Sequence, residues 1–334
     1  MKAMLLCAGL GVRLKPLTEH IPKPMLPIFG RQTADYALES LAEAGATDVV
    51  VNLHHLPDKV KSSLGTRSRG MNIHYSFEPA LLGPTGGIRK ALPALGDEPF
   101  IVVNGDALME IDFKSMMRAH ISNGAALTIA VGPGHDTPDI RAVGVDPQFR
   151  VRSLWGIPAR PGESLSDKVN LGCFIYDPRI VKTYIPDNSF YHFREGFIPE
   201  LFEREERIFA YETDTYWNDI GSPKSYLRAW TDAFDGAGTP RMKKTANAQI
   251  EESSRRLNSE TKSGRIQFIH PVYVEQGAEI GEGAVIGPDA ALCAGSKVGA
   301  GASVSRSLVM QNSVVCESAI VRVSIVFQDK VIPT

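Results

Sequence analysis

The feature that most constrains the fold is a repeat of six residues that fills the last part of the chain. From Phe268 to Cys316, every sixth residue is apolar, and a small or apolar residue stands four positions after the start of each step. A sustained period of six is typical of a parallel β-helix, in which three hexads make one triangular coil. We therefore predict a small left-handed parallel β-helix over residues 266–334. Ordinary alternating strands are the alternative, and a period without slippage argues against them.

Two sets of repeated positions are expected to point into this β-helix. The first set is Phe268, Val274, Ile280, Ile286, Leu292, Val298, Val304, Met310 and Cys316. The second set is Val272, Ala278, Ala284, Ala290, Ser296, Ala302, Leu308, Val314 and Ile320. Glycines that follow several positions of the first set are expected to form the corners.

The preceding part of the chain alternates apolar runs with helical patterns. Strands are predicted at Ala3–Cys7, Asp48–Leu53, Asn72–Phe77, Phe100–Asn104 and Leu127–Val131. Helices are predicted at Thr33–Ala44, Pro57–Leu64, Thr85–Leu95 and Phe113–Ser122. This order predicts an α/β domain over residues 1–235, with a Rossmann-like, mostly parallel sheet covered on both faces. Ligands of such sheets bind at the carboxyl ends of the strands. The polar residues 236–265 are predicted to be a linker or a partly helical connector.

Composition excludes several classes of partner. The formal net charge is −2, with 43% hydrophobic and 22% charged residues, so nothing favours nucleic acid or an anionic membrane as a partner. The N-terminus lacks the apolar segment of a signal peptide, and no stretch approaches a membrane span. Four cysteines (Cys7, Cys173, Cys293 and Cys316) show no metal-ligand spacing, and we expect them to be reduced and buried in a cytoplasmic protein.

A phosphate-binding loop is predicted directly after the first strand. That strand ends in Ala8-Gly9-Leu10-Gly11, where glycines let backbone N–H groups approach a ligand. Arg13 follows, and its guanidinium can bind two phosphate oxygens. Lys23 lies between two prolines that stiffen its backbone. A plain strand–turn–helix junction is the alternative, but glycines, arginine and lysine at this spacing favour a polyphosphate site.

Residues 6–25 resemble the signature of the sugar nucleotidyltransferases, also called NDP-sugar pyrophosphorylases. Further blocks resemble the family in the same order: VVNLHHLPDKV (50–60), EPALLGPTGGI (78–88), VVNGDALME (102–110), NLGCFIY (170–176) and WNDIGSPKSYLRA (217–229). The hexapeptide tail resembles the second domain of many members. The resemblance implies an enzyme that joins a nucleoside monophosphate to a sugar 1-phosphate, uses Mg²⁺ and releases pyrophosphate.

The resemblance also implies roles for individual residues. Arg13, Lys23 and Asp106 would be catalytic, with Lys23 neutralising the α-phosphate or the sugar phosphate. The nucleotide-binding residues would be Ala8, Gly9, Gly11, Arg13, Glu78, Gly83, Gly87 and Asp106. Asp106, at the end of an apolar strand, and the distant Asp219 would bind Mg²⁺, which prefers oxygen ligands; each taken alone could be an ordinary turn or capping aspartate. Asn170 and Gly172 would contact the sugar, although a buried strand with a bulge glycine is the alternative.

The chain departs from the family where many members carry Glu-Lys-Pro, whose lysine reaches the sugar phosphate. The aligned residues here are Gly156-Ile157-Pro158, so that lysine is missing. Lys168 or Arg160 could replace it, and Lys168 could equally be a solvated loop lysine. Adjacent His54 and His55 point to opposite faces of a strand and cannot easily share an ion. The aromatic stripe Tyr184–Phe197, which includes Phe190, Tyr191, His192 and Phe193, could be a sugar platform, core packing or a dimer contact.

Two other functions compete with this one. Hexapeptide acyltransferases generally need a histidine base in the β-helix, and the repeat here holds only His270, at its start. A catalytically silent regulatory subunit is disfavoured because Arg13, Lys23, Asp106 and Asp219 are all present. The stretch Gly83–Ile88 and the overall arrangement most resemble mannose-1-phosphate guanylyltransferases and related heptose or hexose-1-phosphate enzymes, which implies GTP and mannose 1-phosphate, with UTP or dTTP as alternatives. Because the end coils of a β-helix expose backbone edges, we expect a homo-oligomer.

Overall fold

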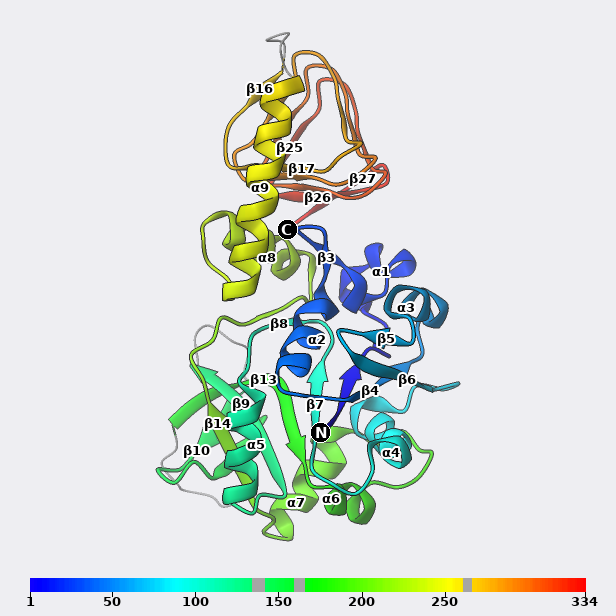
Figure 1. Ribbon diagram of the computed structural model, residues 1–334, viewed down its shortest axis with the longest axis vertical. Helices are drawn as coiled ribbons and strands as arrows, with labels where there is room; N and C mark the ends of the chain where they lie inside the picture. Colours follow the sequence, from blue (N-terminus) through cyan, green and yellow to red (C-terminus); the bar gives the residue numbers. More distant parts are fainter. Residues whose placement is uncertain (134–141, 159–165, 261–265) are drawn as a thin grey trace. The chain divides into compact units, whose positions relative to one another are not determined.

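The computed structural model describes residues 1–133, 142–158, 166–260 and 266–334, and it divides into two compact units (Figure 1). The first unit comprises Met1–Leu10, Pro22–Met25 and Ala34–Trp217. The second comprises Gly11–Ile21, Leu26–Thr33 and Asn218–Thr334. Two pieces of the predicted phosphate-loop region therefore belong to the same unit as the hexapeptide repeat.

The centre of the first unit is a parallel sheet in the order β7-β1-β4-β6, extended at one edge by β5. Its strands are β1 (Lys2–Leu6), β4 (Asp48–Leu53), β5 (Arg67–Ser68), β6 (Met71–Phe77) and β7 (Phe100–Asn104). The central strands β1, β4 and β7 are buried along most of their length, as parallel strands between helices must be, whereas β6 near the edge alternates buried and exposed residues. The four parallel strands predicted from the apolar runs are confirmed. All four end at the same edge of the sheet, which is where the candidate site lies.

Beyond β7 the sheet becomes mixed rather than parallel. The long strand β13 (Ser166–Tyr176) is antiparallel to β7, and the predicted strand at Leu127–Val131 is antiparallel to β13. The remaining strands of this part are β9 (Leu127–Pro133), β10 (Ala142–Val145), β11 (Val151–Leu154), β12 (Ile157–Pro158) and β14 (Ile208–Glu212). The tight turn between β11 and β12 can join only antiparallel strands, as observed for this pair.

Helices cover both faces of this sheet. On one face α4, α6 and α7 contribute to a core cluster with β1, β7, β9 and β13. Helix α5 covers the other face. Its His120 Nδ1 lies 2.9 Å from Oγ1 of Thr128, a residue of β9 whose side chain points away from that cluster. The helices of the first unit are α2 (Thr33–Glu43), α3 (Pro57–Leu64), α4 (Gly83–Leu95), α5 (Phe113–Ser122), α6 (Pro178–Tyr184), the π-helical turn η4 (Phe193–Phe197) and α7 (Ile198–Glu203), with the short elements η2 (Lys23–Met25) and β8 (Ala107–Leu108). The helices predicted at these positions are confirmed.

The repeat region forms a parallel β-helix with three narrow sheets (Figure 1). The first sheet contains β16 (Gln267–Phe268), β19 (Val285–Ile286), β22 (Ser303–Ser305) and β25 (Ile320–Arg322). The second contains β17 (Val272–Val274), β20 (Ala290–Leu292), β23 (Leu308–Val309), β26 (Ser324–Phe327) and the antiparallel β27 (Lys330–Pro333). The third contains β18 (Glu279–Ile280), β21 (Lys297–Val298) and β24 (Val314–Val315). Successive coils stack through parallel strand pairs, as the period of six predicts.

The repeat slips by one residue in the third coil, which a regular period of six does not predict. Phe268 pairs with Ile286 and Ile286 with Val304, eighteen positions apart, but Leu292 pairs with Val309 and Val304 with Val321, seventeen apart. The turn between β22 and β23, in which Arg306 has a positive φ of 47°, is one residue shorter than a full hexad step. A shift of one residue exchanges the two faces of every later strand.

Several inward positions predicted after this turn are therefore wrong. The inner cluster contains Val309, Val315 and Val321. Cys316 and Ile320 are exposed, and Val314 on β24 is 45% exposed. The expectation that all four cysteines are buried fails at Cys316 for the same reason. The other three are buried.

The second unit also contains a layer of aromatic side chains outside the β-helix. Phe29 contacts Trp230 of α8 at a ring-centroid distance of 4.4 Å and Tyr273 of β17 at 5.3 Å. Tyr226 donates a hydrogen bond of 2.7 Å from its hydroxyl to the carbonyl of Pro27. The elements of this layer are η1 (Val12–Leu14), α1 (Leu17–His20), β2 (Pro27–Ile28), β3 (Arg31–Gln32), β15 (Asn218–Asp219) and α8 (Pro223–Phe234).

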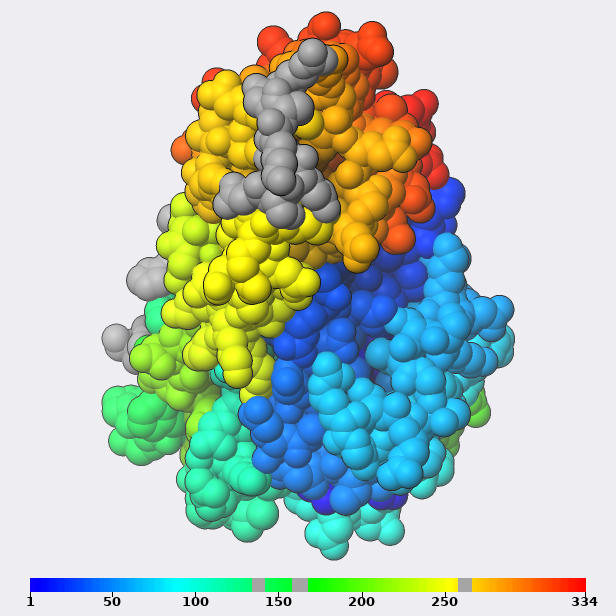
Figure 2. Space-filling view, turned by 45° about the horizontal axis from the view of Figure 1, so that its top comes forward, coloured from blue at the N-terminus to red at the C-terminus, as the bar shows by residue number. Residues whose placement is uncertain are grey.

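The predicted connector is mostly one helix, α9 (Pro240–Glu260), which lies along the coils of the β-helix (Figure 2). Ser253 Oγ accepts a hydrogen bond of 2.9 Å from the backbone N–H of Val274, and Arg256 donates to the carbonyl of the same residue. No helix in the part of the chain that the structure describes is long and apolar enough to cross a bilayer.

The register slip predicts opposite outcomes for one substitution at two adjacent positions. Val315 is 2% exposed and Val314 is 45% exposed. We expect Val315→Thr to lower the free energy of unfolding by about 1–2 kcal/mol, because it buries a hydroxyl among apolar side chains. The matched variant Val314→Thr should change it by less than about 0.5 kcal/mol. Urea denaturation followed by circular dichroism measures both, and equal losses at the two positions would contradict the observed register.

Burial of His120 predicts a loss of stability in mild acid. Burial lowers its pKa from 6.5 to about 4. Between these values the unfolded chain binds a proton that the folded chain does not, so stability is retained above pH 6.5 and falls as the pH drops toward 4. At pH 4.5 this histidine alone should cost on the order of 2 kcal/mol. The variant His120→Asn, which keeps a polar atom near Thr128, should lack this component when urea midpoints are compared at pH 4.5 and 7.

Candidate active site

Two adjacent pockets open at the carboxyl ends of the parallel strands in the first unit. The larger has a volume of about 390 Å³ and the smaller of about 240 Å³. They share Leu6 at the end of β1, Asn104 at the end of β7, and Pro84 at the start of α4. Two ligands bound side by side would therefore meet at the edge of the central strands.

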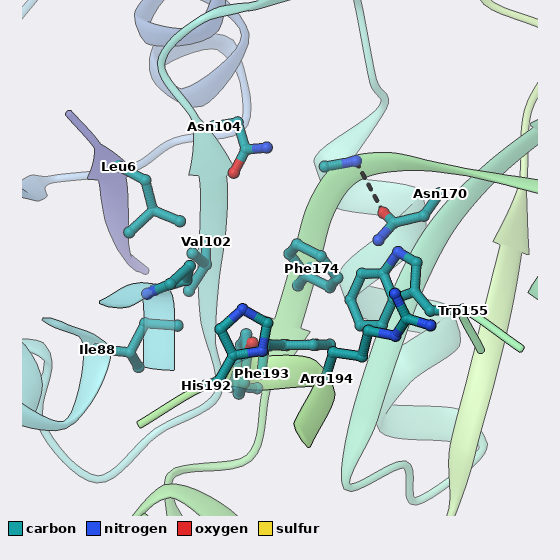
Figure 3. A pocket seen from close by; sticks show the side chains of 13 residues that line it. Leu6, Ile88, Val102, Asn104, Trp155, Asn170, Phe174, His192, Phe193 and Arg194 are labelled. Atoms are coloured by element: carbon teal, nitrogen blue, oxygen red, sulfur yellow. Dashed lines mark hydrogen bonds between the residues drawn. The ribbon is translucent and has the colours of Figure 1, made fainter. Parts of the chain in front are cut away.

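The larger pocket has an apolar floor and a few polar groups at its walls (Figure 3). Its lining residues are Leu6, Pro84, Ile88, Val102, Asn104, Trp155, Asn170, Gly172, Phe174, Tyr176, His192, Phe193 and Arg194. Figure 3 shows Trp155 and Arg194 across the pocket from Leu6 and Val102. Apolar walls with a few placed polar groups are typical of a small-molecule site.

A β-bulge in β13 brings the two predicted sugar-contacting residues to this pocket. The pairing of β13 with β9 shifts between Asn170 and Phe174, and Asn170 Oδ1 accepts a hydrogen bond of 2.8 Å from the N–H of Gly172. Gly172 has a φ of +79°, and a Cβ there would lie 2.5 Å from the Asn104 amide nitrogen. Only glycine fits, so the bulge and the pocket are parts of one arrangement.

Two buried polar atoms of this pocket have no hydrogen-bond partner in the described residues. They are the hydroxyl of the completely buried Tyr176 and Nδ1 of His192. Burial also raises the pKa of Tyr176 well above its usual value, so that hydroxyl stays a donor. An unpaired buried polar group is costly, and a ligand that carries hydroxyl groups would remove the cost.

The smaller pocket contains five of the predicted site residues. It is lined by Leu6, Cys7, Ala8, Gly9, Lys23, Pro24, Asn52, Leu81, Gly83, Pro84, Asn104 and Asp106. The structure thus brings the glycine-containing end of β1 and the lysine of the Pro-Lys-Pro segment together with the aspartate after β7, which is 83 residues from that lysine in sequence.

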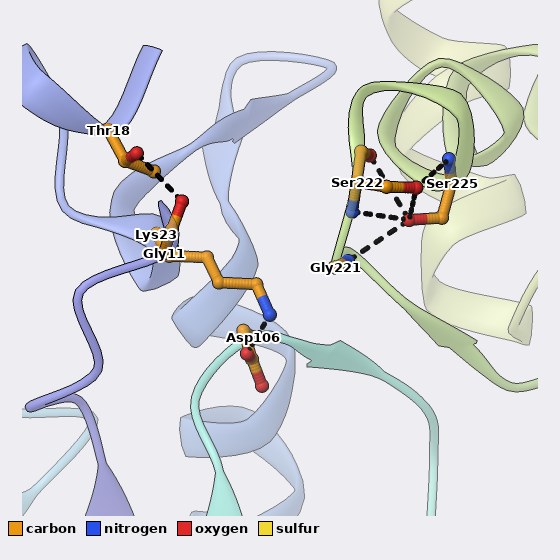
Figure 4. A network of polar contacts seen from close by, with 7 residues as sticks. All are labelled: Gly11, Thr18, Lys23, Asp106, Gly221, Ser222 and Ser225. Atoms are coloured by element: carbon orange, nitrogen blue, oxygen red, sulfur yellow. Dashed lines mark hydrogen bonds and ion pairs between the residues drawn. The ribbon is translucent and has the colours of Figure 1, made fainter. Parts of the chain in front are cut away.

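Lys23 and Asp106 form an ion pair in this pocket (Figure 4). Lys23 is held at the start of η2, and the adjacent Pro24 packs against the backbone of Gly105. Both side chains are largely shielded from solvent, at 13% and 22% exposed. A cation and a carboxylate thus stand next to a cradle of backbone amides, which suits a phosphate group with its metal ion.

Beneath the smaller pocket, a chain of hydrogen bonds ties three strand ends together. Asn52 Oδ1 accepts from the N–H of Cys7 at 2.8 Å, and its amide donates to Glu78 Oε1 at 2.9 Å. Glu78 Oε2 accepts from the N–H of Leu82 at 3.0 Å. Glu78 is completely buried and does not line either pocket. Its geometry supports a positioning role, and direct contact with the base stays a prediction.

The glycines at the start of α4 are required by packing as well as by any ligand. A Cβ on Gly86 would lie 2.6 Å from the carbonyl oxygen of Ser189, and one on Gly87 would lie 2.6 Å from Glu78 Oε1. Gly83 lines the smaller pocket, but Gly87 lines neither. The segment that precedes η4 therefore sits directly on α4 and carries His192 into the larger pocket.

Neither buried cysteine of the sheet is suited to nucleophilic chemistry. Burial, followed by the charge of Asp106, raises the pKa of the Cys7 thiol far above its usual value, and burial does the same for Cys173. Both thiols stay protonated and inert at neutral pH. His54 is also structural, since its Nδ1 lies 2.8 Å from the carbonyl oxygen of Glu78.

Of the candidates for the missing lysine, Lys168 forms an ion pair with Glu212 and lines neither pocket. Arg160 lies outside the described residues. Ile157, which occupies the position of the family lysine, pairs with Leu154 in the hairpin that carries Trp155. Sequence reasoning did not single out Arg194, which lines the larger pocket.

Arg13 and Asp219 belong to the second unit. Arg13 lies on η1, which begins after Gly11, a residue with a φ of +61° whose carbonyl accepts a hydrogen bond of 2.9 Å from Thr18 Oγ1 (Figure 4). A Cβ on Gly221 would lie 2.7 Å from Arg13 Nη2 and 3.0 Å from Asp219 Oδ2. The arginine and the aspartate therefore converge on one glycine.

The donor set is compatible with magnesium. Asp106 in the first unit and Asp219 in the second each carry a hard carboxylate of the kind that Mg²⁺ prefers, and Mg²⁺ often needs only one or two carboxylates besides phosphate oxygens. Within the described residues, no cluster of three or more His, Cys, Asp or Glu side chains could hold a metal by itself. A magnesium ion held by one or two carboxylates would complete its coordination with phosphate oxygens or water.

Comparison with known proteins decides the family. Residues 2–235 match the nucleotidyl transferase family, and residues 268–333 match the GMPPB C-terminal domain. The chain belongs to the nucleotidyl transferase family. The resemblance inferred from the signature segments is thereby confirmed.

Several relatives of this nucleotidyltransferase family member have curated names. A UTP–glucose-1-phosphate uridylyltransferase of Synechocystis is 32% identical over 69% of this chain and 62% of its own length. A mannose-1-phosphate guanyltransferase of Candida albicans is 30% identical over 68% of this chain and 63% of its own length. The matched region thus spans less than two thirds of these relatives.

Solved structures agree with this fold. HddC from Yersinia pseudotuberculosis, which was also solved in complex with GMP-PN, matches with a TM-score of 0.57 and 27% identity. The match covers 68% of this chain and 96% of HddC.

Three functional side chains of this nucleotidyltransferase were not singled out from the sequence. Asn52 has a local signal, because it is a polar residue at the end of the apolar run Val49–Val51. Trp155 and Arg194 have no local sequence signal. Trp155 reaches the larger pocket through the pairing of β11 with β10, and Arg194 reaches it through the packing of η4.

The hydrogen-bond chain predicts a large cost for losing Asn52. Asn52→Leu would leave the N–H of Cys7 without its acceptor and Oε1 of the buried Glu78 without its donor. We expect the free energy of unfolding to fall by about 3 kcal/mol, measured by urea denaturation. Asn72, which donates to Asp48 at the surface, provides the matched control, and Asn72→Leu should cost less than about 1 kcal/mol. Equal costs would mean that the chain does not hold the strand ends together.

Proposed function

We propose that this protein transfers a nucleoside monophosphate from a nucleoside triphosphate to a sugar 1-phosphate, giving an NDP-sugar and pyrophosphate. The observation that carries the proposal is the pair of adjoining pockets that share Asn104 and Leu6. One pocket offers backbone amides with a lysine and an aspartate, and the other offers two unpaired polar atoms that can bind hydroxyl groups. The family match over residues 2–235 supports the same reaction.

The reaction needs mainly positioning and neutralisation of charge. A phosphate oxygen of the sugar 1-phosphate attacks the α-phosphorus in line, and pyrophosphate leaves with the electrons of the broken P–O bond. No general base is required, because the attacking phosphate is already ionised. Lys23 would release Asp106 and bind phosphate oxygens, which lowers the repulsion between the two anionic substrates.

In this proposal, Ala8, Gly9 and Gly83 contact the nucleotide in the smaller pocket, and Gly11 and Arg13 bind its phosphates. Asp106 and Asp219 are the proposed ligands of Mg²⁺, which would offset the charge on the triphosphate when bound. Asn170 and Gly172 contact the sugar in the larger pocket. Glu78 and Gly87 act from behind the smaller pocket by fixing the start of α4.

GTP and mannose 1-phosphate are the substrates that the comparisons support best. Proteins named mannose-1-phosphate guanyltransferase recur among the relatives, and one from Mycobacterium tuberculosis is 28% identical over 84% of this chain. The match of the tail to the GMPPB C-terminal domain and the GMP-PN complex of HddC point in the same direction. The Synechocystis relative makes UTP with glucose 1-phosphate the second pair to test.

The β-helix is proposed as an assembly module. The antiparallel β27 covers the edge of β26, whereas β24 and β25 are the last strands of the other two sheets. Free backbone edges and exposed apolar residues such as Ile320 favour association with a second copy. The homo-oligomer predicted from the sequence remains the proposal, and light scattering tests it.

A pyrophosphate-release assay that crosses four nucleoside triphosphates with a panel of sugar 1-phosphates tests the function. We expect the highest kcat/KM with GTP and mannose 1-phosphate in the presence of Mg²⁺. Asp106→Asn should lower kcat/KM on the order of 10²-fold, because the charge that holds the metal is lost while the shape is kept. Asp97→Asn removes an exposed carboxylate paired with Lys182 and should leave the rate unchanged. Absence of turnover with every pair would refute the proposal.

A further inference from the structure

We infer that Arg194 supplies the positive charge that binds the phosphate of the sugar 1-phosphate. The inference rests on the proposed function and adds a specificity-determining residue to it. Its basis is the charge balance of the larger pocket and the way η4 positions the arginine.

Arg194 is the one lysine or arginine among the described residues that line the larger pocket. No ion pair with a carboxylate of the described ranges neutralises it, in contrast to Lys23 with Asp106 and Lys168 with Glu212. A sugar phosphate that enters this pocket brings a dianion into mostly apolar surroundings. Such a charge requires a cation at the pocket, and Arg194 is placed to provide it.

The backbone that carries Arg194 is held firmly although its side chain is exposed. The preceding Phe193 is buried and packs edge-on against Trp155, with ring centroids 4.7 Å apart, and against Phe174 at 5.4 Å. Phe197, at the other end of η4, is completely buried. An arginine on a fixed turn loses less conformational freedom when it closes on a ligand, and its planar fork can bind two phosphate oxygens.

Trp155 connects this arrangement to the missing family lysine. Trp155 and Ile157 belong to the same tight hairpin, in which Leu154 pairs with Ile157. Both Trp155 and Arg194 line the pocket opposite Leu6 and Val102 (Figure 3). The guanidinium of Arg194, which η4 carries, therefore lies at the same wall of the pocket as the β11–β12 hairpin. The pocket thus keeps a cation that can bind phosphate, although position 157 holds no lysine.

Steady-state kinetics with the substrate pair found in the pyrophosphate assay test this inference. Arg194→Ala should raise the KM for the sugar 1-phosphate roughly 10- to 100-fold, because a charge-assisted contact made in the ground state is lost. The KM for the nucleoside triphosphate should change by less than about 2-fold, and Arg194→Lys should lie between the wild type and the alanine variant. The matched control Lys182→Ala, whose exposed ammonium is paired with Asp97 away from both pockets, should leave both KM values unchanged.

A second substitution that restores a positive charge distinguishes the loss of charge at Arg194 from the loss of its packing. Adding Ile157→Lys to Arg194→Ala returns a cation to the neighbouring hairpin and should recover at least about 5-fold of the lost affinity for the sugar phosphate. An unchanged sugar-phosphate KM in Arg194→Ala overturns the inference, and so does an equal rise in both KM values. The proposed function fails separately, when the wild type turns over no substrate pair. Circular dichroism and Arg194→Gln, which keeps length without charge, exclude misfolding as the cause.

Discussion

The hydrogen-bond chain from the Cys7 amide through Asn52 and Glu78 to the Leu82 amide is the interaction on which the rest of the site depends. It joins the ends of β1 and β4 to the loop that enters α4, and all of its members are buried or on buried backbone. The two pockets open directly above these strand ends. A buried carboxylate with both oxygens occupied by donors allows little movement, so the amides that face the smaller pocket are held in place before any ligand arrives.

Much of the fold could be predicted from the sequence, because burial on both faces makes parallel strands read as unbroken apolar runs. The runs at Asp48–Leu53 and Phe100–Asn104 coincide with β4 and β7. The direction of β13 could not be predicted, since apolar runs carry no information on strand direction. The slip in the β-helix was also hidden: Met310 and Cys316 are apolar in the sequence, and only the short turn at Arg306 shows that Val309 and Val315 point inward instead.

The site divides in the same way between local and long-range information. Gly9, Lys23 and Asp106 stand in short motifs whose residue types suit phosphate and metal, and the structure brings all three into one pocket. Trp155, His192 and Arg194 stand in no such motif. They reach the larger pocket because Phe193 packs between Trp155 and Phe174, which is a consequence of tertiary packing. Local sequence therefore predicts the glycine, lysine and aspartate of the smaller pocket, whereas tertiary packing decides which aromatic and charged groups line the larger pocket.

The composition of the second unit shows why the hexapeptide repeat is more than an appendage. The outer face of the β-helix sheet that contains β17 is covered by other side chains. Tyr273 is buried against Phe29 and Trp230. The Tyr226 hydroxyl lies 3.7 Å from the sulfur of Met310 and donates a hydrogen bond to the carbonyl of Pro27. Phe29 and Pro27 belong to the segment that follows the phosphate-loop signature, and Arg13 is in the same unit. Without the repeat these aromatic side chains would form an exposed apolar patch, which monomeric domains avoid. The β-helix thus completes the core around the segments that flank Lys23, and a change in its packing is transmitted to them by direct contact.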